Sequence, residues 1–164
     1  MKKMVCGVIS ITLLLFTLVA SASSVDAVSS ASVENFYGDY ALTDDALMNA
    51  INSFSGFYTI GTTNENNSPN NGFFIYAMKK HNNCYYLQLG LAQCQTKTNL
   101  LRTGEGIAMY AATPSTNEGD MTFATAGARM HFKIVTDTNV ITTLSEGVAE
   151  GTMFGEVIKV LPLG

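Results

Sequence analysis

The feature that most constrains the fold is a strict alternation in ARMHFKIV, residues 128–135. Every second residue is apolar and the residues between are basic: the apolar set is Met130, Phe132 and Ile134, and the basic set is Arg129, His131 and Lys133. Successive side chains of a β-strand point to opposite faces of its sheet, so this segment is predicted to be a strand with one buried face. A chain containing such a strand has to fold around a β-sheet.

Other short segments have the composition of strands, and turn-forming residues separate them. These segments are residues 56–63, 73–78, 84–91, 106–113 and 155–163. The sequence KKHNN, residues 79–83, predicts a hairpin turn, and NENNSPNNG, residues 64–72, predicts a loop. Five or six mostly antiparallel strands favour a small β-barrel, because closing a sheet removes its exposed edges.

Short helices are expected beside these strands. Residues 42–54 have the amphipathic pattern of a helix, with Leu47, Ile51 and Phe54 at helical spacing and Thr43 or Asp44 as the cap. Residues 140–147 predict another short helix, which their β-branched side chains weaken. The expected fold class is therefore mainly β with short helices, an α+β domain.

Composition limits the kinds of protein that this chain can be. A length of 164 residues suits one domain, and a hydrophobic content of 47% is sufficient for a core. Charged residues make up only 13% of the chain and the net charge is −4, which argues against disorder and against a nucleic-acid binder with a basic face.

The first residues have the three-part pattern of a secretory signal peptide: two lysines, an apolar run and small residues. We expect cleavage after Ala22, or as late as Ala27, and export of the mature chain. Residues 23–35 then form a flexible tether, and residues 36–164 form the folded domain. Because residues 4–25 carry no charge, an uncleaved membrane anchor is the alternative.

Export leaves two cysteines, Cys84 and Cys94. A predicted strand separates them by roughly 30 Å if it is straight, so we expect two free thiols rather than a disulfide. No paired His/Cys spacing predicts a metal site, and the two histidines, His81 and His131, lie far apart in the sequence.

The stretch LAQCQTKTNLLRTG, residues 91–104, predicts a short helix directly after a strand. Thr96 or Thr98 can cap it and Gly104 can end it, with Leu100 and Leu101 as the docking face. At the start of this helix, free backbone N–H groups, two hydroxyls and the Lys97 ammonium would favour an anion, and Arg102 would approach the same side. The alternative is an ordinary capped helix with a solvated lysine.

A resemblance to a known family bears on this alternative. The succession FFIYAM, KKHNN, CYYLQLGL, QTKTNL and GIAMYAAT resembles the pyridoxamine 5′-phosphate oxidase-like, FMN-binding split β-barrel superfamily, and GARMHFKIVTD resembles that group's later strand. The resemblance covers residues 42–164. It implies a split β-barrel that forms a homodimer, with FMN in grooves between the subunits.

The resemblance also implies a set of cofactor-binding residues. Lys97 would pair with the phosphate, Thr96 or Gln95 would donate a hydrogen bond to it, and Thr98 would add a second hydroxyl. Main-chain groups of the segment 73–78 would lie near the edge of the flavin ring. The remaining residues implied at the flavin are Phe74, Ile75 and Tyr76 in that segment and Leu89 and Gly90 in the neighbouring strand. Arg129 is a further candidate from the sequence itself, as a second anion contact on a basic strand face.

The basic ladder of Arg129, His131 and Lys133 has a second interpretation, as a solvent-facing or dimer-covered exterior. Two departures from the family pattern exclude vitamin B6 oxidase activity. The true oxidases resemble a plan with an arginine at the strand NNGFFIYAM and an Arg-Lys pair at the corner, where this chain has Thr96 and Lys97. The arginine- and histidine-bearing substrate segment near their C-terminus is also missing, since EVIKVLPLG offers only Lys159 as a cation.

The sequence contains no nucleophile elbow, phosphate-loop signature or paired acid/base motif, so no catalytic residue is predicted. The expected function is an exported FMN-binding protein, an oxidoreductase acting on an unidentified small molecule, with the flavin providing the redox chemistry. One alternative is a non-catalytic binding module for haem, flavin or another planar anion, with four tyrosines available for stacking: Tyr76, Tyr85, Tyr86 and Tyr110. A cofactor-free barrel dimer is the other.

Overall fold

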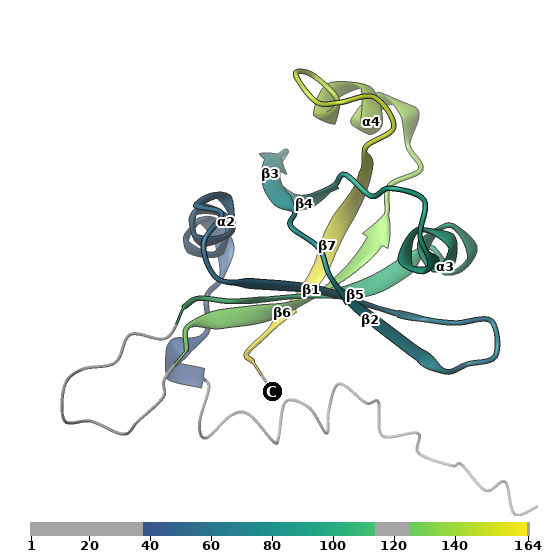
Figure 1. Cartoon of the computed structure of the whole chain (residues 1–164). Helices are drawn as coiled ribbons and strands as arrows, with labels where there is room; N and C mark the ends of the chain where they lie inside the picture. The colour runs from purple at the N-terminus through teal and green to yellow at the C-terminus, as the bar shows by residue number, and fades with distance from the viewer. Residues whose placement is uncertain (1–37, 114–124, 164) are drawn as a thin grey trace, which may run out of the picture.

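The computed structural model describes residues 38–113 and 125–163 (Figure 1). In this part of the chain, seven strands form one sheet in the order β2-β1-β5-β6-β7-β4-β3, with every neighbouring pair antiparallel. The strands are β1 (Phe57–Thr63), β2 (Pro69–Phe73), β3 (Ala77–His81), β4 (Cys84–Leu89), β5 (Glu105–Ala111), β6 (Gly127–Ile134) and β7 (Met153–Leu161). The helices are the 3-10 turn η1 (Gly38–Tyr40) and α2 (Asp44–Asn52), α3 (Gln95–Thr103) and α4 (Thr138–Leu144).

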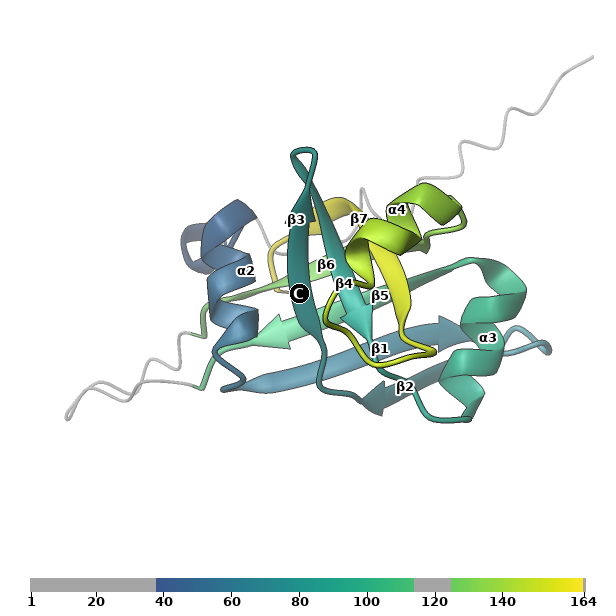
Figure 2. The ribbon, with the colours of Figure 1, turned by 90° about the horizontal axis from the view of Figure 1, so that it is seen from above.

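The chain connection between β2 and β3 explains the curl of the sheet. These two strands lie at opposite edges of the sheet, yet only residues 74–76 separate them in the sequence. The sheet therefore has to bend until its edges approach, and Figure 2 shows β3 and β4 crossing above β1 and β2. Because β2 and β3 do not pair with each other, the barrel stays split.

The inner face of the curled sheet holds the core. Tyr58, Ile60, Met130 and Phe132 are at most 4% exposed there. Backbone glycines make room for the ring of Phe132: a Cβ at Gly155 would lie 2.4 Å from this side chain. Side chains any larger than hydrogen at this position would displace the ring from the core.

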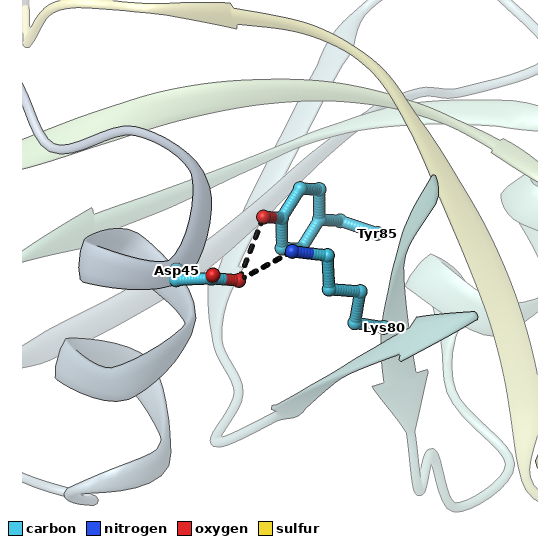
Figure 3. Close-up of polar contacts among 3 residues, drawn as sticks. All are labelled: Asp45, Lys80 and Tyr85. Carbon is cyan, nitrogen blue, oxygen red and sulfur yellow. Dashed lines mark hydrogen bonds and ion pairs between the residues drawn. The ribbon is translucent and has the colours of Figure 1, made fainter. Parts of the chain in front are cut away.

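Helix α2 closes one side of the barrel with two fully buried side chains, Leu47 and Ile51. At its solvent side, Asp45 accepts hydrogen bonds from Lys80 Nζ at 2.9 Å and Tyr85 Oη at 2.8 Å (Figure 3). The helix predicted over residues 42–54 is confirmed over Asp44–Asn52. Phe54 lies beyond its end and is 61% exposed, so the predicted core role of Phe54 is wrong.

The predicted alternation in residues 128–135 is confirmed in β6, where Ala128, Met130 and Phe132 are buried and Lys133 is exposed. The predicted helix 140–147 begins earlier, at Thr138, because the Asp137 side chain accepts hydrogen bonds from the first-turn N–H groups. Cys84 and Cys94 are free thiols, as expected.

Two predictions about the strands are wrong. The sheet has seven strands rather than five or six, because the predicted loop 64–72 contains β2. The predicted strand 73–78 is divided, with Phe73 ending β2 and Ala77 beginning β3. Strand β2 lies at an edge of the sheet, where Pro69 can occupy the first position without losing a hydrogen bond to a neighbouring strand. Its asparagines are typical of loops, which is why the sequence predicted a loop there.

The turn predicted within residues 79–83 is shorter than its sequence suggested. Strand β3 continues through His81, and the turn consists of Asn82 and Asn83 with φ values of 48° and 61°. Asparagine tolerates this left-handed conformation, which the two central residues of such hairpins adopt.

The predicted signal peptide (1–22) and tether (23–35) lie outside the described residues. None of the helices in residues 38–113 and 125–163 has the length and hydropathy needed to cross a membrane.

Candidate ligand-binding site

The short helix predicted after a strand is present as α3, and its junction with β4 is the corner considered for an anion. Cys94 occupies the N-cap position in an extended conformation, and its side chain makes no cap hydrogen bond. The prediction that Thr96 or Thr98 caps the helix is therefore wrong, because both residues lie in its first turn. The prediction that Gly104 ends the helix is confirmed, since this glycine has a φ of 75°.

The start of α3 has free hydrogen-bond donors and no negative side chain. The first intrahelical bond runs from Thr98 N–H to the Cys94 carbonyl at 3.1 Å, so the N–H groups of residues 95–97 have no acceptor within the helix. The first turn contains no acidic residue. Both facts favour an anion at this end of the helix.

Lys97 folds back over the preceding loop instead of extending into solvent. It is half-buried, and its Nζ donates to the Leu91 carbonyl at 3.3 Å. The side chains of Gln95 and Thr98 also bond locally, to Asn99 Oδ1 at 2.9 Å and the Cys94 carbonyl at 3.2 Å. One long hydrogen bond therefore holds the ammonium group to the loop that precedes the helix.

Thr96 differs from its neighbours because it is buried. It is 3% exposed, and its Oγ1 accepts a hydrogen bond from Asn70 Nδ2 of β2 at 2.9 Å. The same Asn70 nitrogen donates to Thr62 Oγ1 at 3.1 Å. From the helix, Asn99 Nδ2 donates to Thr62 Oγ1 at 3.0 Å and to Asn64 Oδ1 at 2.8 Å. We call Thr62, Asn64, Asn70, Thr96 and Asn99 the amide–hydroxyl network.

The rest of α3 docks by one leucine rather than two. Leu100 is fully buried, but Leu101 is 65% exposed, so the prediction for Leu101 is wrong. Arg102 donates to the backbone carbonyl of Thr63 at the end of β1. This helix is thus held by one apolar contact and by hydrogen bonds to the β1–β2 hairpin.

The segment implied at the flavin ring is the connector between β2 and β3. Phe73 and Ile75 are 78% and 71% exposed, and no described residue forms a hydrogen bond with the backbone of Ile75. Phe74 is half-buried, and its N–H bonds the Tyr58 carbonyl at 3.3 Å. The connector therefore presents an unpaired peptide group between two exposed apolar side chains.

Tyr76 belongs to the core. Its side chain is 2% exposed, its hydroxyl donates to the Met109 carbonyl at 2.8 Å, and its ring meets that of Tyr58 edge-on at 5.2 Å. Burial raises the pKa of the Tyr76 hydroxyl well above its ordinary value. Tyr110 is also buried, and its ring lies 5.1 Å from Tyr58. Of the four tyrosines considered for stacking, these two are in the barrel interior.

Three further candidates are spread over two strands. Leu89 is fully buried in β4, whereas Gly90 follows it on the surface. Arg129 lies on β6, where its Nε donates to the Pro162 carbonyl at 2.8 Å. One terminal nitrogen of Arg129 is buried and has no hydrogen-bond partner among the described residues. The structure thus brings Arg129 to the C-terminal segment and shows no bond from it to α3.

A hollow of about 500 Å³ in the outer face of the sheet was not predicted. Its lining residues include Gly61, Asn71, Glu105, Ile107 and His131. A Cβ at Gly61 would have no neighbour nearer than 3.7 Å, so core packing does not require glycine here. A glycine inside a predicted strand was the available signal.

No set of three metal-ligating side chains occurs in the described part of the chain.

Among solved structures, an FMN-binding protein from Syntrophomonas wolfei subsp. wolfei matches with a TM-score of 0.53 and 14% identity, over 85% of this chain and 96% of that one. An FMN-binding domain of a flavin reductase-like enzyme from Shewanella baltica matches with a TM-score of 0.44 and 11% identity, over 70% of this chain and 73% of that one. The haem storage protein HutZ from Vibrio cholerae matches with a TM-score of 0.41 and 11% identity, over 75% of this chain and 92% of that one.

No protein-family model and no curated protein matches the sequence. The similarity to the Syntrophomonas protein, at a low sequence identity, establishes the fold alone. This fold agrees with the one that the resemblance found in the sequence implies.

Proposed function

We propose that this split-barrel protein binds FMN, with the phosphate at the start of α3 and the ring edge at the connector 74–76. The observation that supports this most is the position of Lys97. Lys97 is in the first turn of α3, where the N–H groups of residues 95–97 have no acceptor within the helix and no residue is acidic. The Syntrophomonas protein, which is described as FMN-binding, has the same fold.

The donors at the start of α3 suit a phosphate. Helix N-termini favour anions through their free N–H groups and the helix dipole, and the Lys97 ammonium adds a full charge. The hydrogen bond from Lys97 Nζ to the Leu91 carbonyl is long, at 3.3 Å, and its acceptor is neutral. A phosphate oxygen would form a shorter, charge-assisted bond, so exchanging the carbonyl for phosphate is favourable.

The connector suits the edge of a flavin ring. The pyrimidine edge of a flavin carries both donors and acceptors, and the Ile75 peptide offers one of each without a competing partner among the described residues. The exposed side chains of Phe73 and Ile75 provide apolar surface on both sides of this peptide. When bound, FMN would supply hydride or electron transfer, while the chain binds and orients it.

We further propose that the protein is an exported homodimer. The outer face of the sheet exposes several large apolar side chains, and a second copy would remove them from water: Phe57, Phe73, Ile107 and Ile158. Export is proposed from the N-terminal sequence pattern alone. Size-exclusion chromatography with light scattering and N-terminal sequencing of the mature protein test these two statements.

A second candidate is a non-catalytic module for haem or another planar anion. It is favoured by the hollow over Gly61, where His131 contributes an imidazole to the wall. Haem uptake with a Soret band, together with absence of FMN uptake, would favour this candidate. FMN uptake without a Soret band would reject it.

Replacing Lys97 tests the FMN proposal directly. We expect Lys97→Ala to raise the Kd for FMN at least about tenfold, a loss of ~1.4 kcal/mol or more from a charged contact. Quenching of FMN fluorescence measures both affinities. Lys133→Ala, which removes an exposed lysine of β6, is the matched control and should leave the Kd unchanged. An unaltered Kd in Lys97→Ala would exclude the phosphate from this corner.

A further inference from the structure

We propose that Asn70 is a positioning residue of the ligand site, one that fixes the start of α3 relative to the connector 74–76. This inference rests on the proposed FMN function. Asn70 itself was assigned no role by the sequence pattern, which placed it in a loop. Its side chain instead joins two elements that are distant in the sequence, because the partners Asn70 and Thr96 are 26 residues apart.

The two N–H groups of the Asn70 amide are both used. Nδ2 donates to Thr96 Oγ1 of α3 at 2.9 Å and to Thr62 Oγ1 of β1 at 3.1 Å. Asn99 makes the complementary contact from the helix, donating to the same Thr62 oxygen at 3.0 Å. One hydroxyl of β1 therefore accepts from β2 and from α3, and the three elements share a single hydrogen-bonded centre.

Burial makes this centre sensitive to small displacements. Thr62, Thr96 and Asn99 are 8%, 3% and 1% exposed, so water cannot readily replace a broken hydrogen bond. Neutral hydrogen bonds weaken steeply when their distance and angle change, and a buried group left without a partner is costly. A shift of α3 along the hairpin would break several of these bonds together, so the network holds the helix at one position.

Apolar contacts alone would not fix that position. Helix α3 has nine residues, too few for a helix that is stable by itself, and Leu100 is its one fully buried apolar side chain. Apolar contact has little directional preference and permits sliding. The orientation of the helix start, where the phosphate would bind, therefore comes from the amide–hydroxyl network.

Asn70 also belongs to the strand that leads to the other half of the site. Strand β2 ends at Phe73, and the connector with the unpaired Ile75 peptide follows directly. The Asn70 side chain thus links β2, which leads into the connector with the ring-edge groups, to α3, which carries the phosphate donors. Loss of the Asn70 amide should loosen the phosphate end of the site and leave the connector in place.

The test compares FMN with riboflavin, which has the same ring and no phosphate. In Asn70→Ala we expect the Kd for FMN to rise about tenfold, because a displaced helix start misaligns its donors. The Kd for riboflavin should stay within about twofold of the wild-type value, as for a substitution away from the contact. Fluorescence quenching gives both constants, and thermal denaturation confirms that each variant is folded.

Asn49→Ala is the matched control, since it removes the same amide from an exposed position of α2. It should change neither Kd. Thr62→Val, which removes the shared acceptor from β1 at nearly constant volume, should reproduce the selective loss of FMN affinity. This second variant leaves β2 unaltered, so it tests the network independently of Asn70.

Each other outcome overturns the inference. Equal weakening of FMN and riboflavin in Asn70→Ala would make Asn70 a general support of the fold, and no weakening of either would remove it from the site. Equal affinity of the wild type for both ligands would show that α3 does not hold the phosphate. If the wild type binds neither ligand, the proposed function itself fails.

Discussion

Helices α2 and α3 each contain nine residues and pack at two different sides of the same curled sheet (Figure 2). They are attached by different chemistry. Helix α2 buries two aliphatic side chains, Leu47 and Ile51. Helix α3 buries one leucine together with two polar side chains, Thr96 and Asn99.

The polar contacts of the two helices also differ in where they lie. Asp45 of α2 meets Lys80 and Tyr85 at the solvent-exposed rim, and Asn52 at the end of α2 exchanges two part-buried hydrogen bonds with the Met78 backbone of β3. The amide–hydroxyl network of α3 is more deeply buried and links side chains of three elements. Apolar burial stabilises a helix without specifying its register, while buried amides stabilise one geometry over its neighbours. The comparison suggests that α2 mainly contributes stability and that α3 is oriented for the candidate site.

The largest expected effect tests the apolar attachment of α2. Because Ile51 is fully buried, Ile51→Ala should lower the free energy of unfolding by about 2–5 kcal/mol through lost burial and the cavity left behind. Chemical denaturation measures this loss, and Asn49→Ala, an exposed position of the same helix, is the control. A loss no larger than that of the control would contradict an apolar attachment.

A smaller effect is expected in the attachment of α3. Asn99→Ala removes the donor to Thr62 and Asn64, and leaving buried polar groups unpaired costs about 1–3 kcal/mol. Leu101→Ala on the exposed side of the same helix should leave the free energy of unfolding nearly unchanged. Combining Asn99→Ala with Thr62→Val should cost less than the sum of the two single losses, since both break one network. Full additivity would show that the two residues are not coupled.

The smallest effect is expected at the rim of α2, and it depends on pH. Hydrogen bonds from Lys80 and then from Tyr85 lower the pKa of the Asp45 carboxyl below its ordinary value of 3.8. A depressed carboxyl pKa stabilises the folded state at pH values above the unfolded pKa, and this contribution is lost as the pH falls through the folded pKa. Both charges are solvent-exposed, so the contribution should be small and salt-sensitive.

Asp45→Asn should therefore be less stable than wild type near neutral pH, and the two should converge in strong acid. Thermal denaturation between neutral pH and the acid range measures the difference, with and without added salt. A difference that persists in acid would mean that the ion pair is not its source.

The sequence alone predicted much of the fold, because local periodicity reports which side chains face a core. The alternation in residues 128–135 predicted β6, and the helical spacing of Leu47 and Ile51 predicted α2. Gly104 was predicted to end the helix after residue 95, and it ends α3 in a left-handed conformation. The split-barrel resemblance agrees with the fold of the Syntrophomonas protein.

Local patterns failed where a residue's role depends on distant partners. Asn70 was predicted to lie in a loop, yet its side chain joins a buried network. The partners that join α3 to the β1–β2 hairpin lie 26 to 37 residues apart in the sequence. The periodicity of apolar residues indicates which face of a helix or strand is buried. Hydrogen bonds between side chains of different elements form only when the curled sheet brings those elements together. The sequence therefore determined the elements, and the tertiary structure decided which polar side chains hold them in register.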